Sequence, residues 1–112
     1  MKAINSFEIV IGGENQPGNP PQYAGSTVGT VHHVPVPAAV KVAATDKKPA
    51  HTTPEIKINP DSVIWWQAVE GISDLDKVAS LDIAPGDSDD AVELSLKVSA
   101  PCRVKLRIFV AN

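Results

Sequence analysis

Two segments with alternating side chains decide the fold, and they occupy residues 91–110, which read AVELSLKVSAPCRVKLRIFV. The apolar members of the first segment are Val92, Leu94, Leu96 and Val98. Those of the second are Cys102, Val104, Leu106, Ile108 and Val110. Successive side chains of a strand point to opposite faces of a sheet, so this period of two buries one face and leaves the other in water. We predict two strands whose apolar faces contact one shared core.

Only Ala100 and Pro101 separate the two segments, and we predict that they pair as an antiparallel hairpin. Opposite residues in such a pair have nearly constant summed numbers. An even sum places Val98 across from Cys102 and Val92 across from Ile108, with both apolar sets on the same side. A slip by one residue would expose one apolar set to water, so this register is favoured.

Shorter runs of similar character precede this pair. We predict further strands over residues 7–11, 28–34, 40–44, 55–58, 62–69 and 77–83, and at most one helical turn over 71–76. About seven or eight short strands, bounded by Gly and Pro, with no helix of normal length, predict an all-β chain. The expected architecture is an antiparallel β-sandwich, and the residues leave immunoglobulin-like and jelly-roll topologies both open.

Eight of the ten prolines lie before residue 61, which excludes a long helix in that half because proline removes a backbone donor. Residues 12–26 are rich in Gly, Asn, Gln and Pro and show no strand pattern. We therefore predict a long Pro/Gly-rich N-terminal arm or surface loop there. The whole chain, residues 1–112, is expected to form one domain, since this length can bury a single core.

Composition excludes several functional classes. The net charge of −3 and the sequence pI near 5.5 give no overall basic field, so a nucleic-acid partner is not expected. A single cysteine excludes an intrachain disulfide. The N-terminal residues lack an apolar signal-peptide core, and no apolar run approaches the roughly 20 residues that span a bilayer. We expect cytoplasmic synthesis without a signal peptide, and no membrane partner.

No catalytic constellation is recognisable. The sequence has no Gly-Lys-Ser/Thr phosphate loop and no Gly-x-Ser-x-Gly nucleophile turn. Cys102 falls on the inward side of its predicted strand and is interpreted as an inert core thiol. We therefore predict that the protein is not an enzyme and needs no cofactor.

No metal site is predicted. His32 and His33 are neighbours in a strand and point to opposite faces, so they would not share one ion, although either could pair with His51. The acidic residues between Asp87 and Asp90 lack the spacing of a calcium loop. They are interpreted as a solvated turn.

Two features exceed what a plain two-sheet fold needs. In the run Val63-Ile64-Trp65-Trp66 one indole must leave the core, where a subunit, a Pro-rich arm or a sugar ring could cover it. The candidate binding residues are Trp65, Trp66, Gln67 and Tyr23. The second feature is a possible basic strip on the last strand, formed by Arg103, Lys105, Arg107 and Phe109. We interpret this strip as a solvated strand face rather than as a surface that binds single-stranded nucleic acid.

The leading functional hypothesis is a non-enzymatic structural or assembly protein whose Pro-rich segments bind neighbouring subunits, in a homo-oligomer or a larger assembly. A virion component of the capsid-decoration type is one such protein. The alternative is a carbohydrate-binding β-sandwich module that uses an exposed tryptophan.

Overall fold

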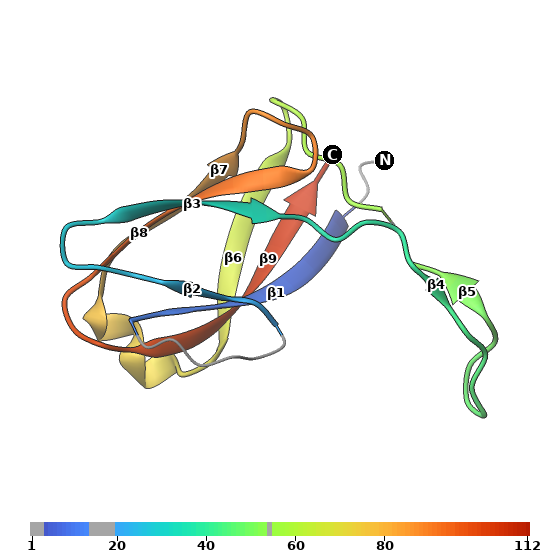
Figure 1. The fold of residues 1–112 in the computed structure, drawn as a ribbon, viewed down its shortest axis with the longest axis horizontal. Helices are drawn as coiled ribbons and strands as arrows, with labels where there is room; N and C mark the ends of the chain where they lie inside the picture. Colours follow the sequence, from blue (N-terminus) through green and yellow to red (C-terminus); the bar gives the residue numbers. More distant parts are fainter. Residues whose placement is uncertain (1–3, 14–19, 54) are drawn as a thin grey trace.

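The computed structural model describes residues 4–13, 20–53 and 55–112, and in these ranges the chain is mostly β (Figure 1). The elements are β1 (Ile4–Gly12), β2 (Gln22–Ala24), β3 (Thr30–Pro35), β4 (Lys41–Val42), β5 (His51–Thr52), β6 (Val63–Glu70), the 3-10 helix η1 (Ile72–Lys77), β7 (Val78–Pro85), β8 (Ala91–Val98) and β9 (Arg103–Ala111). The prediction of an all-β chain is therefore confirmed. None of the described helical residues form a segment long and apolar enough to cross a membrane.

Seven of the described strands form two sheets. One has the order β2-β1-β9-β6 and the other the order β3-β8-β7. All neighbouring strands in them are antiparallel except β1 and β2, which run parallel. The remaining pair, β4 with β5, forms a two-stranded unit of its own.

One hydrophobic core joins the two sheets. Alternation puts Leu94 and Leu96 of β8 and Leu106 and Ile108 of β9 into it, and each is at most 1% exposed. Burying a side chain of this size stabilises the fold by roughly 1.5–3 kcal/mol relative to leaving it in water. The predicted inward faces of these two strands are therefore confirmed.

The predicted hairpin between residues 91–99 and 102–110 is wrong. β8 pairs with β3 and β7, whereas β9 pairs with β1 and β6, so the chain crosses from one sheet to the other over residues 99–102. A tight two-residue hairpin needs positive φ at a central position. Ala100 disfavours that conformation and Pro101 cannot adopt it. Both apolar faces still reach the core, but from different sheets.

Residues 12–26 were predicted to contain no strand, but the structure has one there. Gln22–Ala24 forms β2, held against β1 by hydrogen bonds from the Val10 N–H to the Pro21 carbonyl (2.8 Å) and from the Gly25 N–H to the Gly12 carbonyl (2.7 Å). The part of the predicted arm over 14–19 lies outside the described residues. The short β2 was missed because three residues carry no readable period.

An extended segment leaves the body over residues 37–53. Figure 1 shows it, in green, projecting from one end of the two sheets. We call residues 37–53 the arm; most of them are exposed, and only β4 and β5 pair within it. The strand predicted over 40–44 is reduced to Lys41–Val42.

Both legs of the arm are anchored in the body. Val36 before the arm and Ile56 and Ile58 after it are buried in the core. The Val36 N–H donates to the Asp90 carbonyl (2.9 Å) and the Ile58 N–H to the Asp89 carbonyl (2.8 Å), both in the turn between β7 and β8. Residues 55–58 form no strand, so the strand predicted there is wrong, although its isoleucines are buried.

The predicted helical turn near residues 71–76 is present as η1. Gly71 precedes it with φ of 72°, and a Cβ there would lie 2.2 Å from the Arg103 carbonyl oxygen. Within η1, the Asp74 carboxylate accepts a hydrogen bond from the Arg103 N–H (3.1 Å) and pairs with Lys77 (3.1 Å). η1 thereby fixes the ends of β6 and β9 relative to β7.

Candidate functional site

The outer face of the sheet β2-β1-β9-β6 holds most of the residues that the sequence singled out. Register places side chains of β1, β9 and β6 in cross-strand rows on this face. These rows are Ile4–Ala111–Val63, Ser6–Phe109–Trp65, Glu8–Arg107–Gln67 and Val10–Lys105–Glu70. The face therefore runs from an apolar end, through an aromatic row, to two charged rows.

The aromatic row is built around one stacked pair. Trp65 and Phe109 are direct cross-strand partners, and their rings lie 5.3 Å apart between centroids with an angle of 8° between planes. This spacing matches the distance between neighbouring strands, so the ring faces point along the sheet from one strand to the next. One indole face is covered by Phe109, and the other faces the open edge beyond β6. Trp65 remains 40% exposed.

Trp66 takes the inward position. It lies opposite Ile108 and packs, half-buried, against the core. Alternation requires that one of the two indoles point into the core and the other out of it. The register with β9 determines that Trp66 points in and Trp65 points out. Gln67 is exposed beside Arg107 on the same outer face as Trp65.

Tyr23 does not join these residues. It is the cross-strand partner of Ile11, packs against the core and meets the ring of His32 at 5.5 Å and 60°. Burial raises the pKa of its phenol above the usual value. The inner side of β2 and the outer side of β6 cannot form one binding surface, so the structure separates Tyr23 from Trp65 and Gln67.

The possible basic strip lies on the outer face of β9, as its alternation indicated, but acidic neighbours face it. Arg107 contacts Glu8 (3.3 Å) and donates a hydrogen bond to Ser6 (2.9 Å). Lys105 lies 4.0 Å from Glu8 and 3.8 Å from Glu70. These carboxylates offset much of the positive charge, which leaves a polar face with little field for a polyanion.

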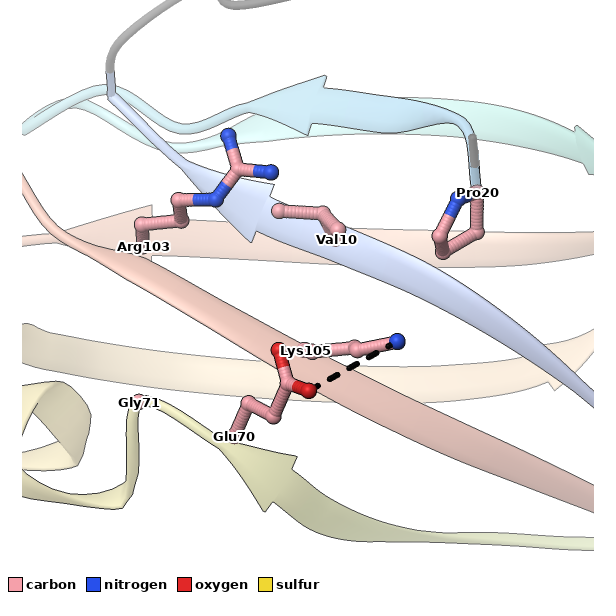
Figure 2. A pocket seen from close by; sticks show the side chains of 6 residues that line it. All are labelled: Val10, Pro20, Glu70, Gly71, Arg103 and Lys105. Atoms are coloured by element: carbon pink, nitrogen blue, oxygen red, sulfur yellow. Dashed lines mark ion pairs between the residues drawn. The ribbon is translucent and has the colours of Figure 1, made fainter. Parts of the chain in front are cut away.

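A groove of about 380 Å³ crosses the charged end of this face. Figure 2 shows its walls, with Lys105 pointing to Glu70 across the groove and Arg103 on the side of Val10. Val10 is only 2% exposed although it belongs to the outer face. Pro20, which also lines the groove, lies just before the start of β2, beside β1. The groove holds two cations and a carboxylate but no buried nucleophile.

A second hollow, of about 400 Å³, lies where the arm leaves the body. Its walls come from the start of β1 and from both legs of the arm: Asn5, Ser6, Pro37, Ala38, Val40, Val42, Thr53 and Ile56. Apolar side chains dominate this lining. The sequence did not predict this cleft, because residues 40–44 have the pattern of a sheet strand and nothing local shows that they project.

The three histidines do not converge on one point. His32 and His33 are neighbours on β3: His32 points inward, where its Nε2 donates to the Ala24 carbonyl (2.8 Å), whereas His33 is exposed on the outer side, opposite Glu93 of β8. His51 belongs to the arm and bonds through Nδ1 to the Pro49 carbonyl (3.0 Å). In the three described ranges, no group of three or more His, Cys, Asp or Glu side chains is placed to hold a metal ion.

The acidic turn from Asp87 to Asp90 holds the two legs of the arm against the body. Its backbone carbonyls accept the two hydrogen bonds that anchor the arm, and the Asp89 carboxylate contacts Lys57 (3.4 Å). Ser88 donates to Asp90 (2.7 Å) within the turn. These contacts account for the turn without an ion.

Cys102 is 5% exposed and faces the core. Burial, and next the nearby Asp74 carboxylate, raise the pKa of its thiol above the usual value. A raised thiol pKa lowers the fraction of thiolate at neutral pH, which is the reactive form. The geometry therefore favours an inert core residue over a nucleophile.

Comparisons with protein-family models, with curated proteins and with solved structures give no match to this chain. Function must therefore be argued from the outer face, the arm and the cleft at its base.

Proposed function

We propose that this protein is a non-enzymatic structural or assembly protein whose arm binds a neighbouring subunit. The observation that carries the proposal is the contrast between the arm and its anchors. Residues 37–53 extend from the body with most side chains in water, while Val36, Ile56 and Ile58 on either side are buried. A projecting segment with firmly held ends is suited to reach a partner.

The arm is poorly stabilised by its own contacts. Its ladder consists of two residue pairs, Lys41 with Thr52 and Val42 with His51, extended by the contacts between Val40 and Thr53. An isolated two-stranded hairpin is at best marginally stable in water. Val40 is 56% exposed in it. A partner that covers the arm would remove this exposed apolar surface from water and order the hairpin.

The body supports this role as a rigid module. We propose an antiparallel β-sandwich, of immunoglobulin-like or jelly-roll kind, because both sheets contribute to one core. Within the assembly class we propose a virion component of the capsid-decoration type, as standalone sandwiches with extended arms recur there. That last step rests on an analogy of fold.

Sedimentation velocity across micromolar to 100 µM concentrations tests the proposal, together with limited proteolysis of the arm. We expect a species larger than a monomer in the concentrated sample. Protease should cleave the arm near Lys47 and Lys48 in the dilute sample, and the arm should be protected in the concentrated one. A strict monomer with an arm that stays sensitive at every concentration refutes the assembly role.

A second candidate is a carbohydrate-binding module, which the free face of Trp65 favours. An indole with one face stacked on Phe109 and Gln67 beside it offers its other face and a polar group to a sugar ring. Titration of tryptophan fluorescence with a glycan panel tests this candidate. A response must disappear in Trp65→Ala and persist in Val31→Ala, which removes an exposed apolar side chain (60% exposed, against 40% for Trp65) from the other sheet.

A further inference from the structure

Among the described residues, the four strands at the edges of the two larger sheets differ in how they are protected against pairing with another chain. β2 has three residues and follows Pro20-Pro21. β3 and β7 end at Pro35 and Pro85, and β7 also carries a bulge and the exposed Asp82. Short strands, prolines, bulges and charges are the usual means by which proteins block edge-to-edge pairing.

β6 lacks such protection along most of its length. Its regular part, residues 63–68, contains no proline and no charged residue, and its bulge comes only between Ala68 and Glu70. β9 pairs with one edge of β6, and no described strand pairs with the other. Exposed Val63 and Trp65 lie on this strand. A long, uncharged, apolar edge is a template for strand addition.

We propose that β6 accepts the arm of a second copy of this chain as an added strand. This inference rests on the proposed assembly role and names its acceptor surface. The occupant is the β4 side of the arm, residues 38–44, paired along the open edge of β6. The sheet of the acceptor then continues from β6 into the arm of its neighbour.

The backbone of the arm leaves a pairing edge open. The Val40 N–H donates to Thr53 Oγ1 (2.9 Å) and the Thr53 N–H donates to the Val40 carbonyl (2.9 Å), so the backbone groups of Val40 face β5. Backbone groups of successive residues point to opposite sides of a strand. The N–H and C=O of Lys41 therefore point away from β5. The arm prolines, Pro37 and Pro49, lie outside residues 38–44.

Charge selects the arm over a second β6 as the occupant. The arm carries three lysines and one aspartate, a net charge of +2, while the remaining residues carry seven basic and twelve acidic side chains, a net charge of −5. Exposed Asp61 and Glu70 flank β6 at its two ends. Antiparallel pairing of two β6 strands would bring Asp61 of one copy close to Glu70 of the other, and like charges across strands are destabilising.

The side chains of the arm also match the two faces of β6. Val40 and Val42 point to one side of β4 and Lys41 to the other. With the valines on the inner side, they extend the half-buried row of Ile64, Trp66 and Ala68. Lys41 then lies on the outer face, near the free indole face of Trp65 and between the two acids. One orientation thus places the valines against the inner row and Lys41 beside the indole.

A charge exchange between two variants tests the inference. In the arm variant, Lys41, Lys47 and Lys48 are replaced by Glu; in the edge variant, Asp61 and Glu70 are replaced by Lys. We expect each variant alone to raise the apparent Kd of self-association at least about tenfold, or 1.4 kcal/mol. An equimolar mixture should restore association, because each variant then supplies a partner of opposite charge.

The matched control reverses two exposed charges on the other sheet, Asp82→Lys and Lys97→Glu, and should associate as the unaltered chain does. If the mixture fails to restore association, or the edge variant alone associates normally, the acceptor assignment is wrong while the assembly role stands. If the unaltered chain is a monomer at 100 µM, both proposals fail.

Hydrogen exchange provides a readout without variants. Backbone amides of residues 63–68 should exchange at least about tenfold more slowly in a concentrated sample than in a dilute one, since the arm pairs with the open edge of β6. Amides of β3, an edge strand of the other sheet, should not change. Slowing confined to any other segment of an associated sample overturns the assignment.

Discussion

Removing the arm should leave the body folded, and the structure sets the size of the effect. The change replaces residues 38–53 by a Gly-Ser linker of about four residues, across the base where the Ile56 N–H meets the Pro37 carbonyl at 3.3 Å. No residue of the excised segment belongs to the core. Shortening a loop of 16 residues to about four lowers its closure entropy cost by (3/2)RT ln 4, or about 1.2 kcal/mol.

Excision also removes the arm residues that line the cleft at the arm base, which exposes its apolar walls and opposes the stabilisation from the shorter loop. The free energy of unfolding should therefore stay within about 1 kcal/mol of that of the full chain. Ile58→Ala is the contrasting variant, because Ile58 is 3% exposed at the arm anchor. Truncating a buried isoleucine costs about 2–5 kcal/mol, a large part of the 5–15 kcal/mol that holds a typical domain.

Urea unfolding followed by tryptophan fluorescence, at concentrations low enough to keep the chain dissociated, measures both variants. The excised chain should keep its m-value nearly unchanged, since the arm is exposed in both states. A loss above about 2 kcal/mol on excision, or an Ile58→Ala variant as stable as the parent, refutes the division into a buried anchor and an independent arm.

Three further predictions concern the body. Gly71→Ala should lower the unfolding free energy by about 1–3 kcal/mol, because φ of 72° is strained for alanine and its Cβ would meet the Arg103 carbonyl; thermal unfolding reports it. The Arg103 N–H and then Lys77 lower the pKa of Asp74, so its stabilising contribution is present above the unfolded pKa and disappears as pH falls through the folded pKa. Asp74→Asn should accordingly be less stable than the parent at pH 7 and equal to it in strong acid, and a difference independent of pH would contradict this. Cys102 should react with a thiol reagent only as fast as the native chain opens, and full labelling within seconds at pH 8 would show that the thiol is not buried.

Period-two alternation predicted which faces of β8 and β9 are buried, but not which strands they pair with. Alternation constrains a side chain relative to its own strand, and the same inward set can contact a core from either layer. The absence of a residue suited to positive φ at Ala100-Pro101 is the signal that excluded a tight hairpin. β2 was missed for another reason, since a three-residue parallel pairing depends on contacts remote in sequence.

The candidate site was predictable only in part. Alternation requires that Trp65 and Trp66 point to opposite faces, yet their assignment depends on the register with β9, which the sequence does not encode locally. Tyr23 was grouped with Trp65 by residue type, whereas its inward position follows from the pairing of β2 with β1. The arm contains valines and alanines like those of a buried strand, so composition could not distinguish a projecting hairpin from a core element.

The anchoring of the arm has a mechanical consequence. A pulling force at the tip reaches the body through two adjacent legs, and each leg is tied both to the turn between β7 and β8 and to the interior. Extraction would require Val36, Ile56 and Ile58 to leave the interior together, which is far harder than unzipping one peripheral strand. A force on the arm is therefore transmitted to the turn between β7 and β8 and to the core that the two sheets share.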